Sequence, residues 1–153
     1  MAGIVTARVI DVHAHVVLAE TFGAAGPLGP EMGGQDGDAP WFRVGNYRLD
    51  GVRYAGSAFM EPSVRLARMK AAGIDFQLLS PNPLTYLHHV PAAEAIRFCQ
   101  CHNDALARQL ALHTEHLAGL AALPMQDIGA AVEELHRAVG DLGLWGAQIG
   151  TDM

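Results

Sequence analysis

The sequence predicts an α/β fold built around a parallel sheet. Three observations support this: one strand with clear two-residue alternation, stretches of helical spacing between later apolar runs, and Gly or Pro at the junctions. Taken in order, the elements run β-α-β-α-β-α-β. Strands that are separated by helices pair in parallel through right-handed crossovers. Four such units also make half of a (β/α)8 barrel, in which the chemistry lies at the carboxyl ends of the strands.

The first predicted strand, residues 8–18, carries two histidines on one face. Side chains two residues apart share a face of a strand, so Asp11, His13 and His15 point the same way. The opposite face is wholly apolar: Ile10, Val12, Ala14 and Val16. Two imidazoles at positions i and i+2 can reach one ion, because a Zn–N bond is about 2.0–2.1 Å long. The alternative is a half-exposed strand that happens to carry two polar residues.

The composition describes one domain with enough apolar material for a core. The chain has 153 residues, of which 50% are hydrophobic and 17% are charged. Sixteen acidic residues against ten basic ones give a net charge of −6, which argues against a nucleic-acid surface or a polybasic membrane anchor. We expect neither a secretory signal nor a membrane span. The two cysteines make no disulfide framework, so a reducing, cytoplasmic setting is expected.

Residues 19–58 interrupt the alternation of strands and helices. They contain nine Gly and three Pro, which is the composition of turns. We therefore expect a Gly/Pro-rich loop insertion without a periodic core face. Its place directly after the histidine strand favours a lid or a substrate-binding excursion, and a surface insertion without function is the alternative.

Three helices follow from start and stop signals. The first is expected to begin at Pro62, which suits the first helical position, and to stop at Gly73. The second is expected over about 91–114. Asp127 is a suitable N-cap for the third, which Gly143 closes.

The later strands are expected at 74–80, 116–123 and 145–149. The middle one is almost continuously apolar, as strands buried on both faces are. None of the strands is followed by Gly-x-Gly-x-x-Gly or a Walker-type loop. A nucleotide-binding sheet is therefore the weaker alternative.

Other reactive side chains are assigned structural places. Cys99 and Cys101 point about 200° apart on a helix, so they do not share one ion, and we expect only Cys99 in the core. His88 and His89 are adjacent in an extended segment, so at most one of them can point into a site. A further set is expected on solvated helix surfaces or at helix ends: His102, His113, His136, Glu133, Glu134 and Arg137.

Four stretches together resemble one protein family. Residues 10–15 (Ile-Asp-Val-His-Ala-His) look like a metal motif of a first barrel strand, and residues 61–80 look like the helix and strand that follow it. Residues 120–126 and 146–151 are similar to its third and fourth strands. The family is the amidohydrolase superfamily, in the branch of aminocarboxymuconate-semialdehyde decarboxylase and related metal-dependent decarboxylases. The resemblance covers most of the chain outside the Gly/Pro-rich stretch.

The resemblance implies a (β/α)8 barrel of the TIM type that holds one divalent metal ion, usually zinc. His13 and His15 match the first two ligands of the family. In the decarboxylases an arginine of the long first loop helps to hold a substrate carboxylate. Arg53 is the best match to this arginine, and Arg43 and Arg48 are the alternatives. The implied substrate is a small unsaturated or aromatic carboxylic acid.

The chain matches only the N-terminal half of such a barrel, about its first four βα units over residues 1–153. The family takes a third metal histidine, a catalytic histidine and a metal aspartate from strands five, six and eight, and these positions are not in this sequence. We expect them in a C-terminal half. Three explanations stay open: a fragment of a longer protein, a half completed by another chain or copy, and a protein that has lost its chemistry.

These expectations define three functions. The first is a metal-dependent carbon–carbon lyase that removes CO2 from a small carboxylic acid. The second is a metal-dependent hydrolase of an ester, lactone or amide, which starts from the same two histidines, because in both a bound metal lowers the pKa of water toward about 7. The third is a non-catalytic half-barrel that serves as an interaction module.

Overall fold

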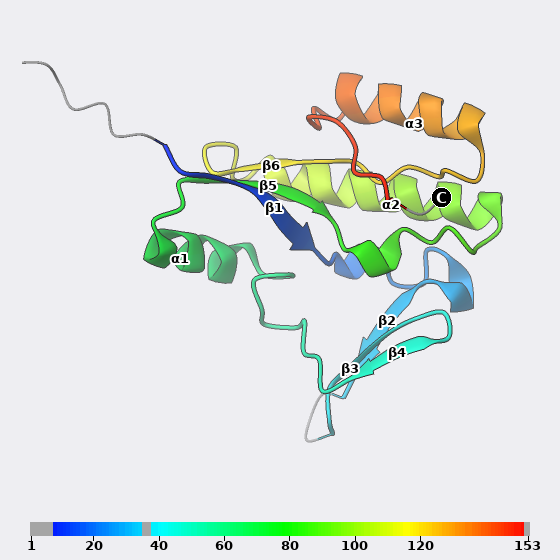
Figure 1. Cartoon of the computed structure of the whole chain (residues 1–153), viewed down its shortest axis with the longest axis horizontal. Helices are drawn as coiled ribbons and strands as arrows, with labels where there is room; N and C mark the ends of the chain where they lie inside the picture. Colours follow the sequence, from blue (N-terminus) through cyan, green and yellow to red (C-terminus); the bar gives the residue numbers. More distant parts are fainter. Residues whose placement is uncertain (1–7, 35–37, 152–153) are drawn as a thin grey trace, which may run out of the picture.

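The structure is a computed structural model that describes residues 8–34 and 38–151. Its central element is a parallel sheet with the strand order β1 (Ile10–Val16), β5 (Phe76–Pro81) and β6 (Leu117–Gly119) (Figure 1). The predicted fourth strand is reduced to a parallel bridge between Ala121 and Ala147. Parallel pairing at this edge continues through the Trp145 amide, which donates to the Gly119 carbonyl at 2.9 Å.

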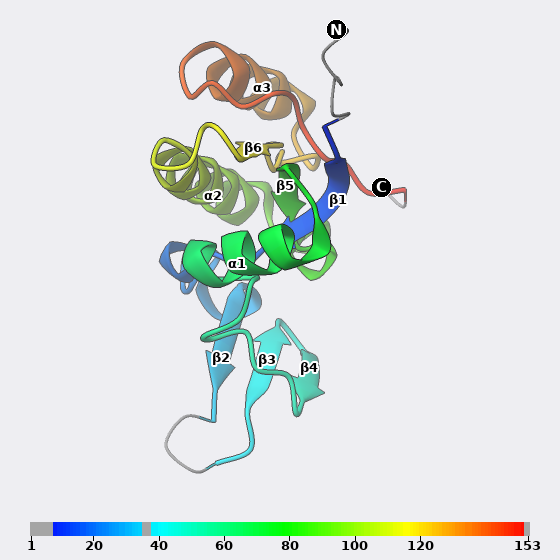
Figure 2. The same cartoon turned by 90° about the vertical axis from the view of Figure 1, so that its left-hand side faces the viewer.

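Three helices connect these strands: α1 (Pro62–Ala72), α2 (Ala92–Leu110) and α3 (Ile128–Gly140). Figure 2 shows them in an arc around the parallel strands. The predicted boundaries of α1 are confirmed, because Pro62 begins it and Gly73 ends it with a φ of 70°, in the left-handed region. The predicted cap of α3 is also confirmed, since an Asp127 carboxylate oxygen accepts from the Ala130 amide at 3.1 Å. Helix α2 ends at Leu110, four residues before the predicted end.

This arrangement is the wall of a partial (β/α)8 barrel, as the sequence predicted. Leu79 on β5 and Leu106 on α2 are fully buried between the sheet and the helices. Gly119 on β6 allows α2 to approach closely, because a Cβ atom at this position would lie 2.7 Å from Leu110 and 2.8 Å from Leu106. Among the described residues, no helix is long and apolar enough to cross a membrane.

The described residues of the segment, 19–34 and 38–58, are folded, contrary to the expectation of a loop without a core face. It forms an antiparallel sheet of three short strands: β2 (Pro30–Gly33), β3 (Trp41–Val44) and β4 (Tyr47–Asp50). Phe42 and Val44 on β3 are buried and pack with Phe98 of α2. The alternation of β3 covers only four residues, which is too short to stand out among nine glycines.

Two side chains that were expected on helix surfaces are buried. His102 on α2 is 2% exposed, and burial lowers its pKa to about 4. Glu134 on α3 is 4% exposed and accepts from Asn103 at 2.7 Å and from Arg137 at 2.8 Å. Charged residues at helical spacing do not reveal which helix packs against them, and here α3 lies against α2. The prediction that Cys99 belongs to the core is confirmed.

Candidate metal and substrate site

The structure brings His13 and His15 together on β1. Their ring centroids are 4.7 Å apart, and the rings meet edge to face at 77°. His13 is exposed and His15 is half-buried, so the pair opens to solvent. His13 is the central residue of β1 and His15 is the last but one, near the carboxyl end at which barrel enzymes place their chemistry.

An irregularity in β1 lies at this pair. The ladder to β5 shifts register between Asp11, which faces Gln77, and Ala14, which faces Leu79. The amide of His13 donates instead to the Asp11 carboxylate at 3.0 Å. Such bulges re-aim side chains and often occur beside active sites.

The imidazole of His15 is fixed through Nδ1. This nitrogen lies 3.1 Å from the carbonyl oxygen of Pro81, which can only accept, so Nδ1 carries the proton. The Ser80 hydroxyl lies 2.9 Å from the same nitrogen and donates to the Ala14 carbonyl at 3.3 Å. A histidine held in this way presents Nε2 as its free electron pair, which is the usual arrangement of a metal ligand.

The electrostatic surroundings also suit a neutral ligand. Burial is the main cause that lowers the pKa of His15, and the neighbouring His13 charge lowers it further. A metal binds the neutral imidazole, so the two nitrogens fit a divalent ion such as zinc. Within residues 8–34 and 38–151, no cluster of three or more His, Cys, Asp or Glu side chains is placed to hold an ion. The donor set is therefore partial.

The three candidate arginines lie in different surroundings. Arg43 donates to Glu31 and, at 2.7 Å, to the Gly45 carbonyl, while Arg48 pairs with Asp50 at 2.8 Å. Arg53 is exposed and makes no ion pair or side-chain hydrogen bond with another described residue. Arg53 follows β4, the last strand of the antiparallel sheet, in the chain.

Arg53 lines a small groove with Trp41 and Tyr54, and the residues of this groove do not include the two histidines. Its neighbour Tyr54 reaches toward the parallel sheet, because the Tyr54 hydroxyl accepts from Asn82 Nδ2 at 3.2 Å. Asn82 directly follows β5. The groove is thus linked to the carboxyl end of β5 by one hydrogen bond.

Two buried residues next to the histidines were not singled out from the sequence. Arg65 on α1 is 5% exposed and Gln77 on β5 is 9% exposed. Burial lowers the pKa of Arg65 to about 10, and the charge of Asp11 acts in the opposite direction. The sequence does contain one indication that Arg65 is buried: it lies four residues before Met69, on the same face of its helix.

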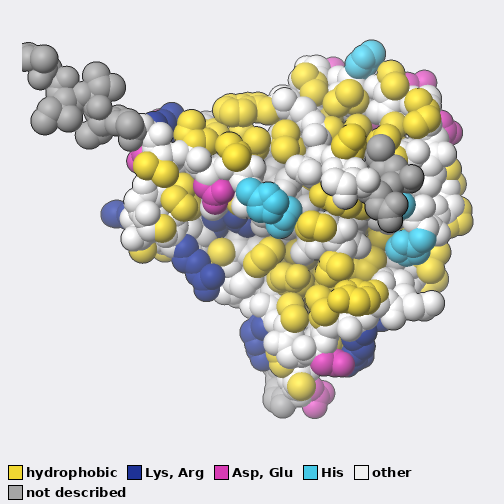
Figure 3. All heavy atoms as spheres, in the orientation of Figure 1, with side chains coloured by type: hydrophobic (Ala, Val, Ile, Leu, Met, Phe, Trp, Pro, Cys, Tyr) yellow, Lys and Arg dark blue, Asp and Glu magenta, His cyan; other side chains and the backbone are white. Residues whose placement is uncertain are grey.

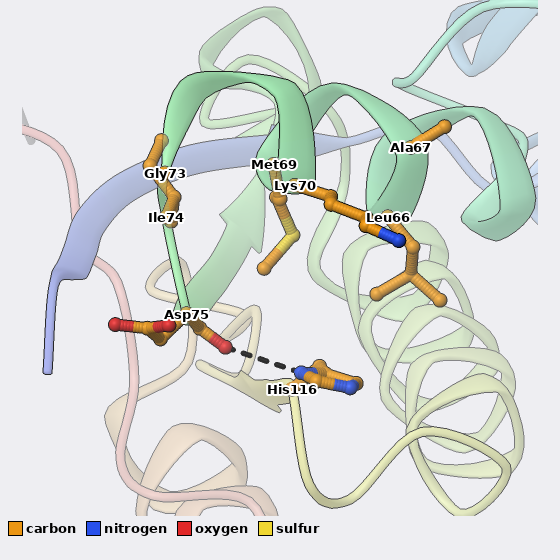
Figure 4. Close-up of a pocket in the computed structure, with 8 residues that line it drawn as sticks. All are labelled: Leu66, Ala67, Met69, Lys70, Gly73, Ile74, Asp75 and His116. Atoms are coloured by element: carbon orange, nitrogen blue, oxygen red, sulfur yellow. Dashed lines mark hydrogen bonds between the residues drawn. The ribbon is translucent and has the colours of Figure 1, made fainter.

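A cavity of about 410 Å³ lies elsewhere in the molecule, and neither His13 nor His15 lines it (Figure 4). It is formed by α1 and the segments that precede β5 and β6, so it belongs to the amino ends of the parallel strands. Apolar side chains of Leu66, Met69 and Ile74 line it, and His116 Nδ1 lies 3.2 Å from the Asp75 carbonyl. The candidate site and this cavity are therefore separate.

Comparison with known proteins assigns the family. Residues 10–153 match the family model described as amidohydrolase. The chain is 31% identical over 107 residues to a 2-amino-3-carboxymuconate-6-semialdehyde decarboxylase of Dictyostelium discoideum, covering 69% of this chain and 30% of that protein. It is 40% identical over 85 residues to a gamma-resorcylate decarboxylase of a Rhizobium species, covering 56% and 26%. This chain belongs to the amidohydrolase family.

Solved structures agree with the fold. A 2,6-dihydroxybenzoate decarboxylase from Rhizobium superposes with a TM-score of 0.65 at 28% identity, over 93% of this chain and 38% of that one. A 5-carboxyvanillate decarboxylase from Novosphingobium aromaticivorans, complexed with manganese and a nitrobenzoic acid, gives 0.53 at 31% identity over 56% and 24%. The predicted family and the partial barrel are confirmed. The chain spans less than half the length of each of these relatives.

Proposed function

We propose that this chain forms the metal-binding first half of a decarboxylase that acts on a small aromatic or unsaturated carboxylic acid. The observation that carries the proposal is the His13 and His15 pair, with His15 Nδ1 anchored on the Pro81 carbonyl. The relatives named above are decarboxylases of such acids, and one of their structures is complexed with manganese. Because the chain covers only part of them, the full activity belongs to a completed barrel.

The two histidines would hold the ion through ring nitrogens, and a bound divalent ion supplies Lewis acidity at the reacting group. Zinc is our expected ion because it suits imidazole ligands, and manganese is the alternative that the carboxyvanillate relative suggests. His13 is exposed and can turn toward the ion, whereas His15 is held by Ser80 and Pro81. The site would thus combine one fixed and one adjustable ligand.

Arg53 would hold a substrate carboxylate. A guanidinium binds a carboxylate through two parallel N–H donors, which fixes the plane of the acid as well as its position. Arg53 is the one of the three candidate arginines without a partner among the described residues. In the proposed reaction the bond between the ring carbon and the carboxylate breaks, CO2 leaves, and a proton takes its place on carbon.

The metal site is tested by metal analysis and turnover. We expect the 153-residue chain to hold Zn²⁺ weakly and to release CO2 from 2,6-dihydroxybenzoate very slowly, since catalytic zinc sites usually have three protein ligands. A form completed by the remaining barrel strands should bind about one ion. In that form His13→Ala or His15→Ala should remove both metal and CO2 release, while the exposed His136→Ala should change neither. Full metal content and normal turnover in His13→Ala would contradict the assignment.

The reaction type and the arginine are tested separately. Ester and lactone hydrolysis, measured beside CO2 release, distinguishes a decarboxylase from the hydrolase alternative. An inactive completed protein with metal restored would support the non-catalytic alternative. Arg53→Met should raise the KM for the carboxylate, whereas the matched control Arg108→Met, which replaces an exposed arginine of α2, should leave the KM unchanged.

A further inference from the structure

Three polar side chains link the backbone of His13 to that of His15. Arg65 Nη2 donates to the His15 carbonyl oxygen at 2.6 Å, and Arg65 Nη1 donates to Gln77 Oε1 at 2.8 Å. Gln77 Nε2 then donates to Asp11 Oδ2 at 2.8 Å. The second oxygen of Asp11 accepts from the His13 amide at 3.0 Å. A continuous series of four hydrogen bonds therefore joins the two histidine segments through α1 and β5.

These four hydrogen bonds hold a part of β1 that the pairing with β5 does not hold. The register of β1 against β5 is irregular between Asp11 and Ala14, so residues 12 and 13 have no ladder partner on β5. An unpaired segment can shift unless other groups hold its N–H and C=O groups. Asp11 holds the amide of His13, and Gln77 holds Asp11 in turn.

Arginine is chemically suited to this position. Its planar guanidinium presents donors in a fixed fork, so Arg65 serves two acceptors on different strands at the same time. Lysine carries a compact charge on a flexible stem and lacks that fork. A guanidinium that is 5% exposed also carries a desolvation penalty, which these two hydrogen bonds and the Asp11 charge offset.

We propose that Arg65 is a positioning residue that sets the relative placement of His13 and His15, so that the two imidazoles bind one ion as a chelate. Arg65 acts through the His15 carbonyl and, by way of Gln77 and Asp11, through the His13 amide. Its two bonded guanidinium nitrogens serve Gln77 and the His15 carbonyl, so Arg65 would act on the ion only through the two histidines. The inference rests on the proposed metal site at the two histidines.

The test is a Zn²⁺ titration of the 153-residue chain, followed by the ring-proton NMR signals of His13 and His15. It uses His13→Ala, His15→Ala and the double variant, in wild-type and Arg65→Met backgrounds. In the wild-type background the contributions of the two histidines to Zn²⁺ affinity should be coupled, so that either single replacement removes most of the affinity. Arg65→Met should weaken Zn²⁺ binding by about tenfold, the lower end for outer-shell partners, and should remove that coupling.

Arg68→Met is the matched control, because Arg68 is an exposed arginine on the same helix. It should change neither affinity nor coupling, and Arg65→Lys should recover only part of the loss. If circular dichroism shows that Arg65→Met is unfolded, Gln77→Met is measured in its place. It leaves Arg65 bonded to His15 and cuts the link to Asp11, so it too should reduce the coupling.

The two hypotheses fail in different ways. Wild-type affinity and full coupling in folded Arg65→Met and Gln77→Met would overturn the positioning role while the metal site stands. No Zn²⁺-dependent shift of either ring in the wild-type chain would overturn the metal site itself. A loss of affinity in Arg68→Met equal to that in Arg65→Met would show a general effect of helix charge and would also overturn the positioning role.

Discussion

Asn103 on α2 makes two hydrogen bonds with the backbone of one residue, Ala122. Its Nδ2 donates to the Ala122 carbonyl at 2.9 Å, and its Oδ1 accepts from the Ala122 amide at 2.8 Å. The same Nδ2 also donates to Glu134 at 2.7 Å. The side chain is fully buried, so it ties the chain after β6 to both α2 and α3.

Replacing Asn103 with Ala should therefore destabilise the protein strongly. The change leaves the N–H and C=O of Ala122 without partners in a buried place, and each such group costs about 1–3 kcal/mol. We expect the free energy of unfolding to fall by about 2–4 kcal/mol, measured by urea denaturation. Asn46→Ala, at an exposed position between β3 and β4, is the control and should stay within about 0.5 kcal/mol of wild type. An equal loss in both variants would contradict this account.

Gly119→Ala should destabilise the packing of α2 on β6. The new methyl group would lie 2.7–2.8 Å from side-chain atoms of Leu110 and Leu106, closer than carbon atoms pack. Overpacking of this kind costs about 1–3 kcal/mol, which thermal or urea unfolding detects. Gly140→Ala is the matched control, because a Cβ atom there meets nothing within 4 Å at the end of α3. It should be neutral or slightly stabilising, since Ala favours helix more than Gly does.

His102 should make the protein less stable as the pH falls below about 6.5. Its pKa is lowered to about 4 by burial, whereas an exposed histidine in the unfolded chain has a pKa near 6.5. Between these values the unfolded chain binds a proton that the folded chain does not, so protonation favours unfolding. This contribution is present above about pH 6.5 and is lost as the pH falls toward 4.

The measurement is the free energy of unfolding from pH 7 to pH 4 in wild type and His102→Leu. His102→Leu should show a shallower decline, by up to roughly 3 kcal/mol at pH 4, because about 1.36 kcal/mol accompanies each unit of pKa difference. His136→Leu removes an exposed histidine of α3 and should follow the wild-type curve. Parallel curves for all three proteins would show that His102 does not govern the acid response.

The 153-residue chain should associate in solution. Large apolar side chains are exposed on β1, where Val12 is 69% and Ile10 is 54% exposed, and beyond α3, where Trp145 is 66% exposed. Figure 3 shows many hydrophobic side chains on one face of the molecule. Among the described strands, the edge of β1 that faces away from β5 has no strand partner, which favours pairing with a second copy or with a complementing C-terminal half.

Sedimentation of the purified chain checks this association. We expect oligomers at micromolar concentration, and Val12→Lys combined with Trp145→Lys should shift the distribution toward monomer. The control is a pair of lysines introduced at Ala93 and Gln100, which are exposed on α2. A monodisperse wild-type monomer with cooperative unfolding would rule out this expectation.

The sequence by itself determined the features that depend on neighbouring residues along the chain. The two-residue period of a strand placed His13 beside His15, Pro62 and Gly73 bounded the first helix, and Asp127 capped the third. These signals are local, because a strand face, a helix start and an N-cap each involve only a few consecutive residues. The motifs of the strands also sufficed to identify the family, which the match over residues 10–153 confirms.

Only the tertiary structure decided which polar side chains are buried and what they hold. Arg65, Gln77 and Asp11 are far apart in the sequence, and their hydrogen bonds exist because α1 and β5 lie against β1. The burial of His102 and Glu134 likewise depends on how α2 packs beside its neighbours. Such contacts join elements by their three-dimensional packing, and the spacing of residues within one helix or strand does not encode that packing.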